Sequence, residues 1–160
     1  MARVFPPEIQ SKPLPGQHIS ELDTLHRLQA ELPDDYTVFH SVHWARSTKS
    51  YTEVGEVDFV VMNRDGRTLL IEQKMGDLQE TPAGLAKTYN ERDKSVTEQM
   101  HRSLDRIRDR WREVGDARIP LDVDVLLYCP GYQVRNLAAA GLDSSRIVDA
   151  RRAAKLVETI

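Results

Sequence analysis

The sequence predicts a single α/β domain in which a mixed β-sheet is flanked by helices. Three observations support this class: helical apolar periodicity over residues 19–32 and 95–114, strand-like alternation over 36–44 and 54–74, and an apolar run at 123–129 that is typical of a buried strand. The expected order is α-β-β-β-α-β, followed by a short β-α segment. A length of 160 residues suits one hydrophobic core and is too short for two ordinary domains.

Composition and charge narrow the class further. An apolar content of 40% and a charged content of 29% are typical of a soluble globular protein. The formal net charge of −3 means that any surface for nucleic acid must be local. Cys129 is the only cysteine, which excludes an internal disulfide and fits a reducing cytosol. No apolar run approaches the roughly 20 residues that cross a bilayer. We therefore expect a cytoplasmic protein without a membrane partner.

The two ends of the chain differ from its middle. Residues 1–17 hold four of the eight prolines and lack the apolar core of a signal peptide, so they are predicted to form an extended N-terminal arm. Residues 18–160 are predicted to form the domain. The chain stops at Ile160 within a helix-like run, which is compatible with a fragment of a longer protein and with a natural end.

The first helix is predicted from about residue 19 to 32, with Ser20 as N-cap and Pro33 at its end. Glu21 projects from within the apolar arc of this helix. A carboxylate on a face that packs against the core needs a partner, so Glu21 is the acid of this helix for which we most expect a bound partner. The arc itself consists of Leu22, Leu25, Leu28 and Leu32.

Residues 54–74 are predicted to form a hairpin, because two alternating apolar segments surround a turn at residues 63–66, where Gly66 tolerates positive φ. A loop symmetric about Asp65 places Asp58 opposite Glu72. Like charges directly opposite each other destabilise a sheet, so two facing carboxylates indicate a cation held between them.

The other segments are assigned by pattern. The helix at 95–114 carries Gln99, Arg102, Arg106 and Arg110 along or just beyond one flank of its apolar stripe. The remaining predictions are a polar loop at 46–52, a long polar loop at 75–94, a short helix at 135–140, a short strand at 146–148 and a helix from about 150.

Asp58, Glu72 and Lys74 form the sharpest chemical signal. Two carboxylates can hold Mg²⁺ or Mn²⁺, and a lysine beside the ion can activate a water or stabilise charge on a phosphorane. The alternative is a solvated sheet face with surface ion pairs. For His18, His40 and His43, no Cys/His spacing supports a structural zinc site, and ordinary satisfied or exposed histidines are expected.

Glu21, the run Gly55-Glu56-Val57-Asp58, the run Ile71-Glu72-Gln73-Lys74 and Gln99 together resemble the nuclease-related domain, NERD, of the PD-(D/E)xK nuclease superfamily. The resemblance covers about residues 16–104. It implies a restriction-endonuclease-like core. The sequence departs from the pattern in having Glu56-Val57 where the superfamily name places proline, and Gln73 where a small or apolar residue is usual.

The resemblance also implies residue roles. Asp58 and Glu72 would bind Mg²⁺ or Mn²⁺, with Glu21 as a direct or water-mediated ligand and the backbone carbonyl of Gln73 completing the coordination. Lys74 would orient or activate the water, and Gln99 would hold the lysine or the scissile phosphate.

Two functions follow. The first is a divalent-metal-dependent nuclease that hydrolyses DNA, with RNA as the less expected substrate. The alternative is a non-catalytic nucleic-acid-binding or docking module of a larger protein, because domains of this family are often joined to helicase or kinase modules. A plain scaffold domain is a third reading. In the first two cases Arg102, Arg106 and Arg110 would contact the phosphate backbone; otherwise they form a solvated face.

Overall fold

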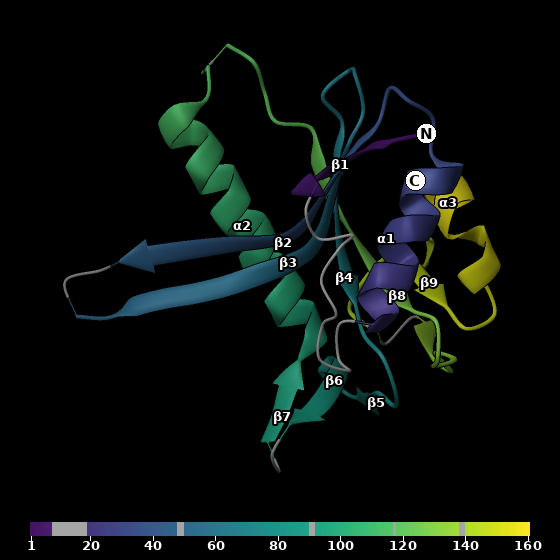
Figure 1. The fold of residues 1–160 in the computed structure, drawn as a ribbon. Coiled ribbons are helices and arrows are strands. Elements are labelled where there is room, and N and C mark those ends of the chain that lie inside the picture. Colours follow the sequence, from purple (N-terminus) through teal and green to yellow (C-terminus); the bar gives the residue numbers. More distant parts are fainter. Residues whose placement is uncertain (8–18, 48–49, 90–91, 117, 138–139) are drawn as a thin grey trace. The chain divides into compact units, whose positions relative to one another are not determined.

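The computed structural model describes residues 1–7, 19–47, 50–89, 92–116, 118–137 and 140–160 (Figure 1). The chain divides into two compact units. The first comprises Met1–Ile71 and Ser103–Asp124, and the second comprises Glu72–Arg102 and Val125–Ile160. No helix in the described ranges is long and apolar enough to cross a membrane.

The main sheet has six strands in the order β1-β2-β3-β4-β8-β9. It is mixed, because β1 pairs parallel with β2, β2–β3 and β3–β4 are antiparallel, and β8 pairs parallel with β9. The predicted α/β class with a mixed, helix-flanked sheet is confirmed. The elements are β1 Arg3–Phe5, α1 Ile19–Glu31, β2 Thr37–Ser47, β3 Thr52–Met62, β4 Thr68–Gln73, α2 Val96–Val114, β8 Val123–Cys129, β9 Ile147–Asp149 and α3 Leu156–Thr159.

In the first unit, α1 forms where the leucine arc predicted it and buries Leu25 and Leu28 completely. The N-terminal strand β1 runs beside β2, and the amide of Ala2 donates to the carbonyl of Gln29 in α1 (3.0 Å). Residues 3–5 are therefore part of the sheet, while the rest of the predicted arm from residue 8 onward lies outside the described residues.

The β3–β4 hairpin adopts the register that the symmetric turn predicted. The observed pairs run from Met62–Thr68 to Phe59–Ile71, and Asp58 and Glu72 each lie one residue beyond the last of them. Gly66 has φ +83° in the turn. The side chain of Asn63 closes this turn by accepting hydrogen bonds from two backbone amides, those of Asp65 and Arg67 (both 3.0 Å).

The β2–β3 ribbon is longer than predicted. Strand β2 continues to Ser47 and β3 begins at Thr52, so the polar loop expected at 46–52 is wrong at both ends, although residues 50 and 51 do lie outside the strands; residues 48 and 49 are not among the described residues. Cross-strand pairing, which polarity does not reveal, extends these strands (Figure 1). Trp44 lies opposite Gly55, and its indole N–H donates to Ser103 Oγ (3.3 Å).

In the second unit, a small antiparallel sheet replaces the long loop predicted at 75–94 (Figure 1). Its strands are β5 Gln79–Thr81, β6 Gly84–Tyr89 and β7 Arg92–Ser95. A tight turn joins the first two strands: Thr81 Oγ1 donates to the carbonyl of Gly84 (2.8 Å), which has φ +113°. The prediction was wrong because buried apolar residues are too few here to set a period; Leu78 and Leu85 are the large ones.

The rest of the second unit follows the sequence more closely. Strand β8 has the predicted bounds, whereas β9 starts one residue later than expected. Cys129 is buried, which raises the pKa of its thiol to about 12, with Asp149 as the second cause. The helix expected from about 150 is divided into a 3-10 turn, Ala153–Lys155, and α3. The short helix predicted at 135–140 includes residues 138 and 139, which lie outside the described residues.

We expect Gly55→Ala to destabilise the first unit. A Cβ at this position would lie 2.2 Å from Cζ2 of Trp44, and the indole is held by Ser103. Overpacking of this kind costs about 1–3 kcal/mol in free energy of unfolding. Urea unfolding measures it. Gly131→Ala is the matched control, because its Cβ would meet nothing nearer than 3.8 Å. Equal stability of the two variants would contradict the close approach.

Glu80 should make the stability of the second unit depend on pH. Its carboxylate accepts hydrogen bonds from the amides of Arg135 (2.7 Å) and Asn136 (2.8 Å) and from the Tyr132 hydroxyl (2.9 Å). These bonds, led by that of Arg135, lower the pKa of Glu80.

A lowered folded-state pKa adds stability that is present above the unfolded pKa of 4.5 and lost as pH falls through the folded value. Glu80→Gln should therefore reduce stability near neutral pH, by less than about 1 kcal/mol because solvent screens the group, and flatten its acid dependence. Unfolding curves recorded from neutral to acid pH test this against the exposed control Glu158→Gln. An unchanged acid slope in Glu80→Gln would refute the assignment.

Candidate active site

Glu72, at the end of β4, is the centre of the candidate site in the second unit. It is 4% exposed and Lys74 is 7% exposed. The Lys74 ammonium donates to Oε1 of Glu72, and Nε2 of Gln99 in α2 donates to the same oxygen (2.5 Å). The backbone amide of Lys74 donates to the carbonyl of Tyr128 in β8 (2.9 Å), and this hydrogen bond fixes the main chain at Lys74. We call Glu72, Lys74 and Gln99 the Glu72 cluster.

The geometry of this cluster follows from strand and helix periodicity. Glu72 and Lys74 are two residues apart, so both side chains leave the chain on the same side. Gln99 comes from the first turns of α2, which starts after Ser95; the Ser95 hydroxyl accepts the amide hydrogen bond of Glu98 (3.1 Å) as an N-cap. A buried carboxylate requires a counter-charge and hydrogen-bond donors, and here it has both.

Lys87 of β6 is a second lysine beside the cluster. Its ammonium donates to the carbonyl of Met75 (2.6 Å), the residue that follows Lys74. Burial lowers the pKa of Lys87, and the positive charge of Lys74 lowers it further. Two cations are therefore gathered near one carboxylate in this unit.

Glu21 and Asp58 belong to the first unit. Oε2 of Glu21 lies 3.4 Å from Nε2 of His40, a histidine that is only 4% exposed, so this ring is the partner that the acid needed. Asp58 is half-buried in β3. The β2–β3 pairing is interrupted at Ser41 and Asp58, between the pairs His40–Phe59 and Val42–Val57, and Ser41 has φ +54°. The assignment of Glu21 and Asp58 to one site with Glu72 stays a prediction.

The metal ligation also stays a prediction. Within the described ranges, no group of three or more His, Cys, Asp and Glu side chains is arranged to hold a metal ion. Gln73 is buried between Glu72 and Lys74, and the expected role of its carbonyl is untested. His43, in contrast to His40, has an exposed side chain, and His18 lies outside the described residues.

Two of the predicted phosphate-binding arginines line a cavity of about 690 Å³ in the first unit. Arg106 is held by Glu53 (3.1 Å) and Asp109 (3.3 Å), whereas Arg110 is exposed and pairs with Glu113 (3.0 Å). Arg102 is exposed on α2 in the second unit. The cavity is lined by Val42, His43, Trp44, Ala45, Arg46, Arg106, Ile107, Asp109, Arg110, Arg112 and Glu113.

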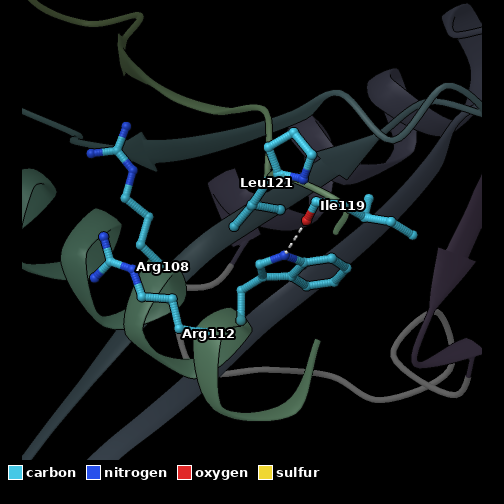
Figure 2. A pocket seen from close by; sticks show the side chains of 6 residues that line it. Arg108, Arg112, Ile119 and Leu121 are labelled. Atoms are coloured by element: carbon cyan, nitrogen blue, oxygen red, sulfur yellow. Dashed lines mark hydrogen bonds between the residues drawn. The ribbon is translucent and has the colours of Figure 1, made fainter. Parts of the chain in front are cut away.

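A smaller cavity of about 310 Å³ lies at the C-terminal end of α2 in the same unit (Figure 2). The indole of Trp111 forms one wall and donates to the carbonyl of Ile119 (3.0 Å). Arg108 and Arg112 also line it, and Arg112 is paired with Asp109 (2.9 Å). This cavity contains none of the residues predicted for the site.

Sequence reasoning missed the positions of two residues: Lys87, beside the Glu72 cluster, and His40, beside Glu21. Lys87 was placed in a loop, although Lys87 and Tyr89 followed by Arg92 and Lys94 have the alternation of a hairpin. His40 is two residues after Val38 in a predicted strand and so shares its face, which was the signal for the burial of His40.

Comparison with protein families matches the chain to the nuclease-related domain over residues 16–131. Comparison with curated proteins and with solved structures gives no match. The matched range includes Glu21, Asp58, the whole Glu72 cluster and the sheet from β2 to β8. Because this match covers well over half of the sequence, the chain belongs to the nuclease-related domain family.

Proposed function

We propose that this domain is a Mg²⁺- or Mn²⁺-dependent nuclease that hydrolyses phosphodiester bonds in DNA. The observation that carries the proposal is the Glu72 cluster: an acid and a lysine, two residues apart, are buried as a pair, and a glutamine from α2 donates to the acid. Membership of the nuclease-related domain family supports the same reading. A buried ion pair beside a second lysine is an expensive arrangement for a merely solvated sheet face.

The proposed metal ligands are the carboxylates of Asp58 and Glu72, with Glu21 bound directly or through water and the carbonyl of Gln73. These are all oxygen donors, which Mg²⁺ and Mn²⁺ prefer, so the chemistry of the donor set fits the ion. A bound ion would polarise the phosphate and lower the pKa of a coordinated water.

The protein side chains supply orientation and charge. Glu72, to which Gln99 also donates, holds the Lys74 ammonium in a buried position, where its charge can stabilise the phosphorane and its N–H groups can orient the attacking water. The water oxygen forms a bond to phosphorus while one ester P–O bond breaks, so water is added across the phosphodiester. Arg102 and Arg110 are the exposed arginines proposed to contact the phosphate backbone.

One observation favours a non-catalytic nucleic-acid-binding module as a second candidate. Lys74 and Gln99 donate to the same oxygen of Glu72, so this carboxylate is compensated by the protein itself. A site that no longer cuts could persist in this form for stability. In that case binding would occur without metal, within a larger DNA-processing protein such as a helicase.

The nuclease proposal predicts metal-dependent cleavage that requires Asp58. Plasmid and single-stranded DNA incubated with Mn²⁺ should be cut, and chelation should abolish cutting. Asp58→Asn and Lys74→Ala should each lower the rate by about a hundredfold or more, because each removes a group that stabilises the transition state. Gel electrophoresis of the products measures it.

Asp65→Asn is the matched control, because Asp65 is an exposed acid in the turn of the same hairpin. It should cleave like the unmodified chain. Equal cleavage by all of these proteins would refute the mechanism. Metal-independent DNA binding without cleavage, unaffected by Asp58→Asn, would instead support the binding module.

Loss of Lys74 should also reveal its coupling to Glu72. Lys74→Met leaves a buried carboxylate without its counter-charge and should cost about 3–5 kcal/mol in free energy of unfolding. The double variant Glu72→Gln/Lys74→Met removes both charges and should recover part of this loss. Urea unfolding of the singles and the double gives the coupling energy. Additive losses would mean that the two side chains do not form a stabilising pair.

A further inference from the structure

The β6–β7 ribbon of the second unit gathers three cations and one aromatic ring on a single face. Lys87 lies directly opposite Lys94, and Tyr89 lies directly opposite Arg92. Residues two apart along a strand point to the same side, and so do directly opposed residues. These four side chains therefore share one face, which we call the β6–β7 face.

Among the described residues of the ribbon, no acid shares this face with the cations. Asp93 lies at the alternate position, on the other face, where the Thr88 hydroxyl donates to it (2.6 Å). Lys87 and Lys94 instead lie over the Tyr89 ring, with their nitrogens 5.3 and 5.5 Å from its centroid. The ring attracts both cations but leaves their charge in place. Two opposed lysines destabilise a strand pair, and an anion bound between them would relieve this cost.

Lys87 places one end of the β6–β7 face beside the Glu72 cluster. The Lys87 ammonium donates to the carbonyl of Met75, next to Lys74, and the charge of Lys74 acts on it. Lys74 and Lys87, together with Lys94 directly opposite Lys87, are therefore neighbouring cations of the second unit. A polyanion bound at the candidate site can extend onto them.

We propose that the β6–β7 face binds single-stranded nucleic acid, with Lys87, Arg92 and Lys94 contacting phosphates and Tyr89 stacking against a base. Tyr89 is 37% exposed, so part of its ring is available. Basic side chains that follow the backbone, combined with an aromatic ring for stacking, are the elements of single-strand recognition. A duplex keeps the faces of its bases covered and cannot use the ring in this way. This inference rests on the proposed function, which makes nucleic acid the substrate.

The test is fluorescence anisotropy with a labelled single-stranded DNA, the matching RNA and the matching duplex, in chelator so that no cleavage occurs. Tyr89→Ala should weaken single-strand binding by about tenfold, and Tyr89→Phe should retain it. Lys94→Ala should reduce the slope of log affinity against log salt by about 0.7, the value for one phosphate contact to a single strand.

Lys155→Ala is the matched control, because it removes the same charge from an exposed position of the second unit. It should leave single-strand affinity unchanged. Unchanged affinity and salt slope in Tyr89→Ala and Lys94→Ala would overturn the proposal, as would an equal loss of duplex binding in Tyr89→Ala. Preference for DNA or for RNA identifies the strand chemistry, and binding through Tyr89 to either supports the proposal.

The outcome is separable from that of the nuclease test. A chain that does not cleave but loses single-strand binding in Tyr89→Ala supports this surface while contradicting the nuclease. A chain that cleaves with Mn²⁺ and binds single strands equally well in both variants contradicts this surface while the nuclease stands.

Discussion

The burial of the Glu72 carboxylate is the constraint on which the candidate site depends. An ionised carboxylate that loses its water needs a nearby positive charge and hydrogen-bond donors, or it becomes protonated. In this chain the need is met from two elements of one unit, by Lys74 beside it in sequence and by Gln99 from α2. The same oxygen therefore fixes the end of β4 and the start of α2 around one point. The contacts that compensate the buried carboxylate are therefore the same contacts that bring the acid, the lysine and the glutamine together.

A second consequence concerns charge. Glu72 is paired with Lys74, whereas the ammonium of Lys87 close by donates to the carbonyl of Met75. Burial and the neighbouring cation both lower the pKa of Lys87, which means that its charged form is held at a cost. An approaching phosphate would lower that cost. The positive character of this region thus arises from local packing, in a chain whose overall charge is −3.

Sequence reasoning succeeded where one period governed a whole element. The leucine arc gave α1, and the turn around Gly66 gave the β3–β4 register. It failed at β5–β7, because short strands with few apolar residues are defined by pairing with each other rather than by a buried face. Within the site, the two-residue spacing in a strand predicted that Glu72 and Lys74 share a face, whereas Gln99 was predicted only from the resemblance to the family. The partnership of Glu21 with His40 depends on helix-to-sheet packing, which no local pattern encodes.

The two candidate functions differ in what compensates Glu72. A lysine and an amide on Oε1 satisfy the carboxylate as a structural group, and a divalent ion would compete with or add to them as a third source of positive charge. In a catalytic site, the Glu72–Lys74 pair must be stable enough for the domain to fold. It must also be weak enough for Glu72 to bind a metal ion and for Lys74 to interact with a phosphate. The second lysine matters for this balance. Because Lys87 and Lys74 repel each other, an anion bound beside them would relieve this repulsion.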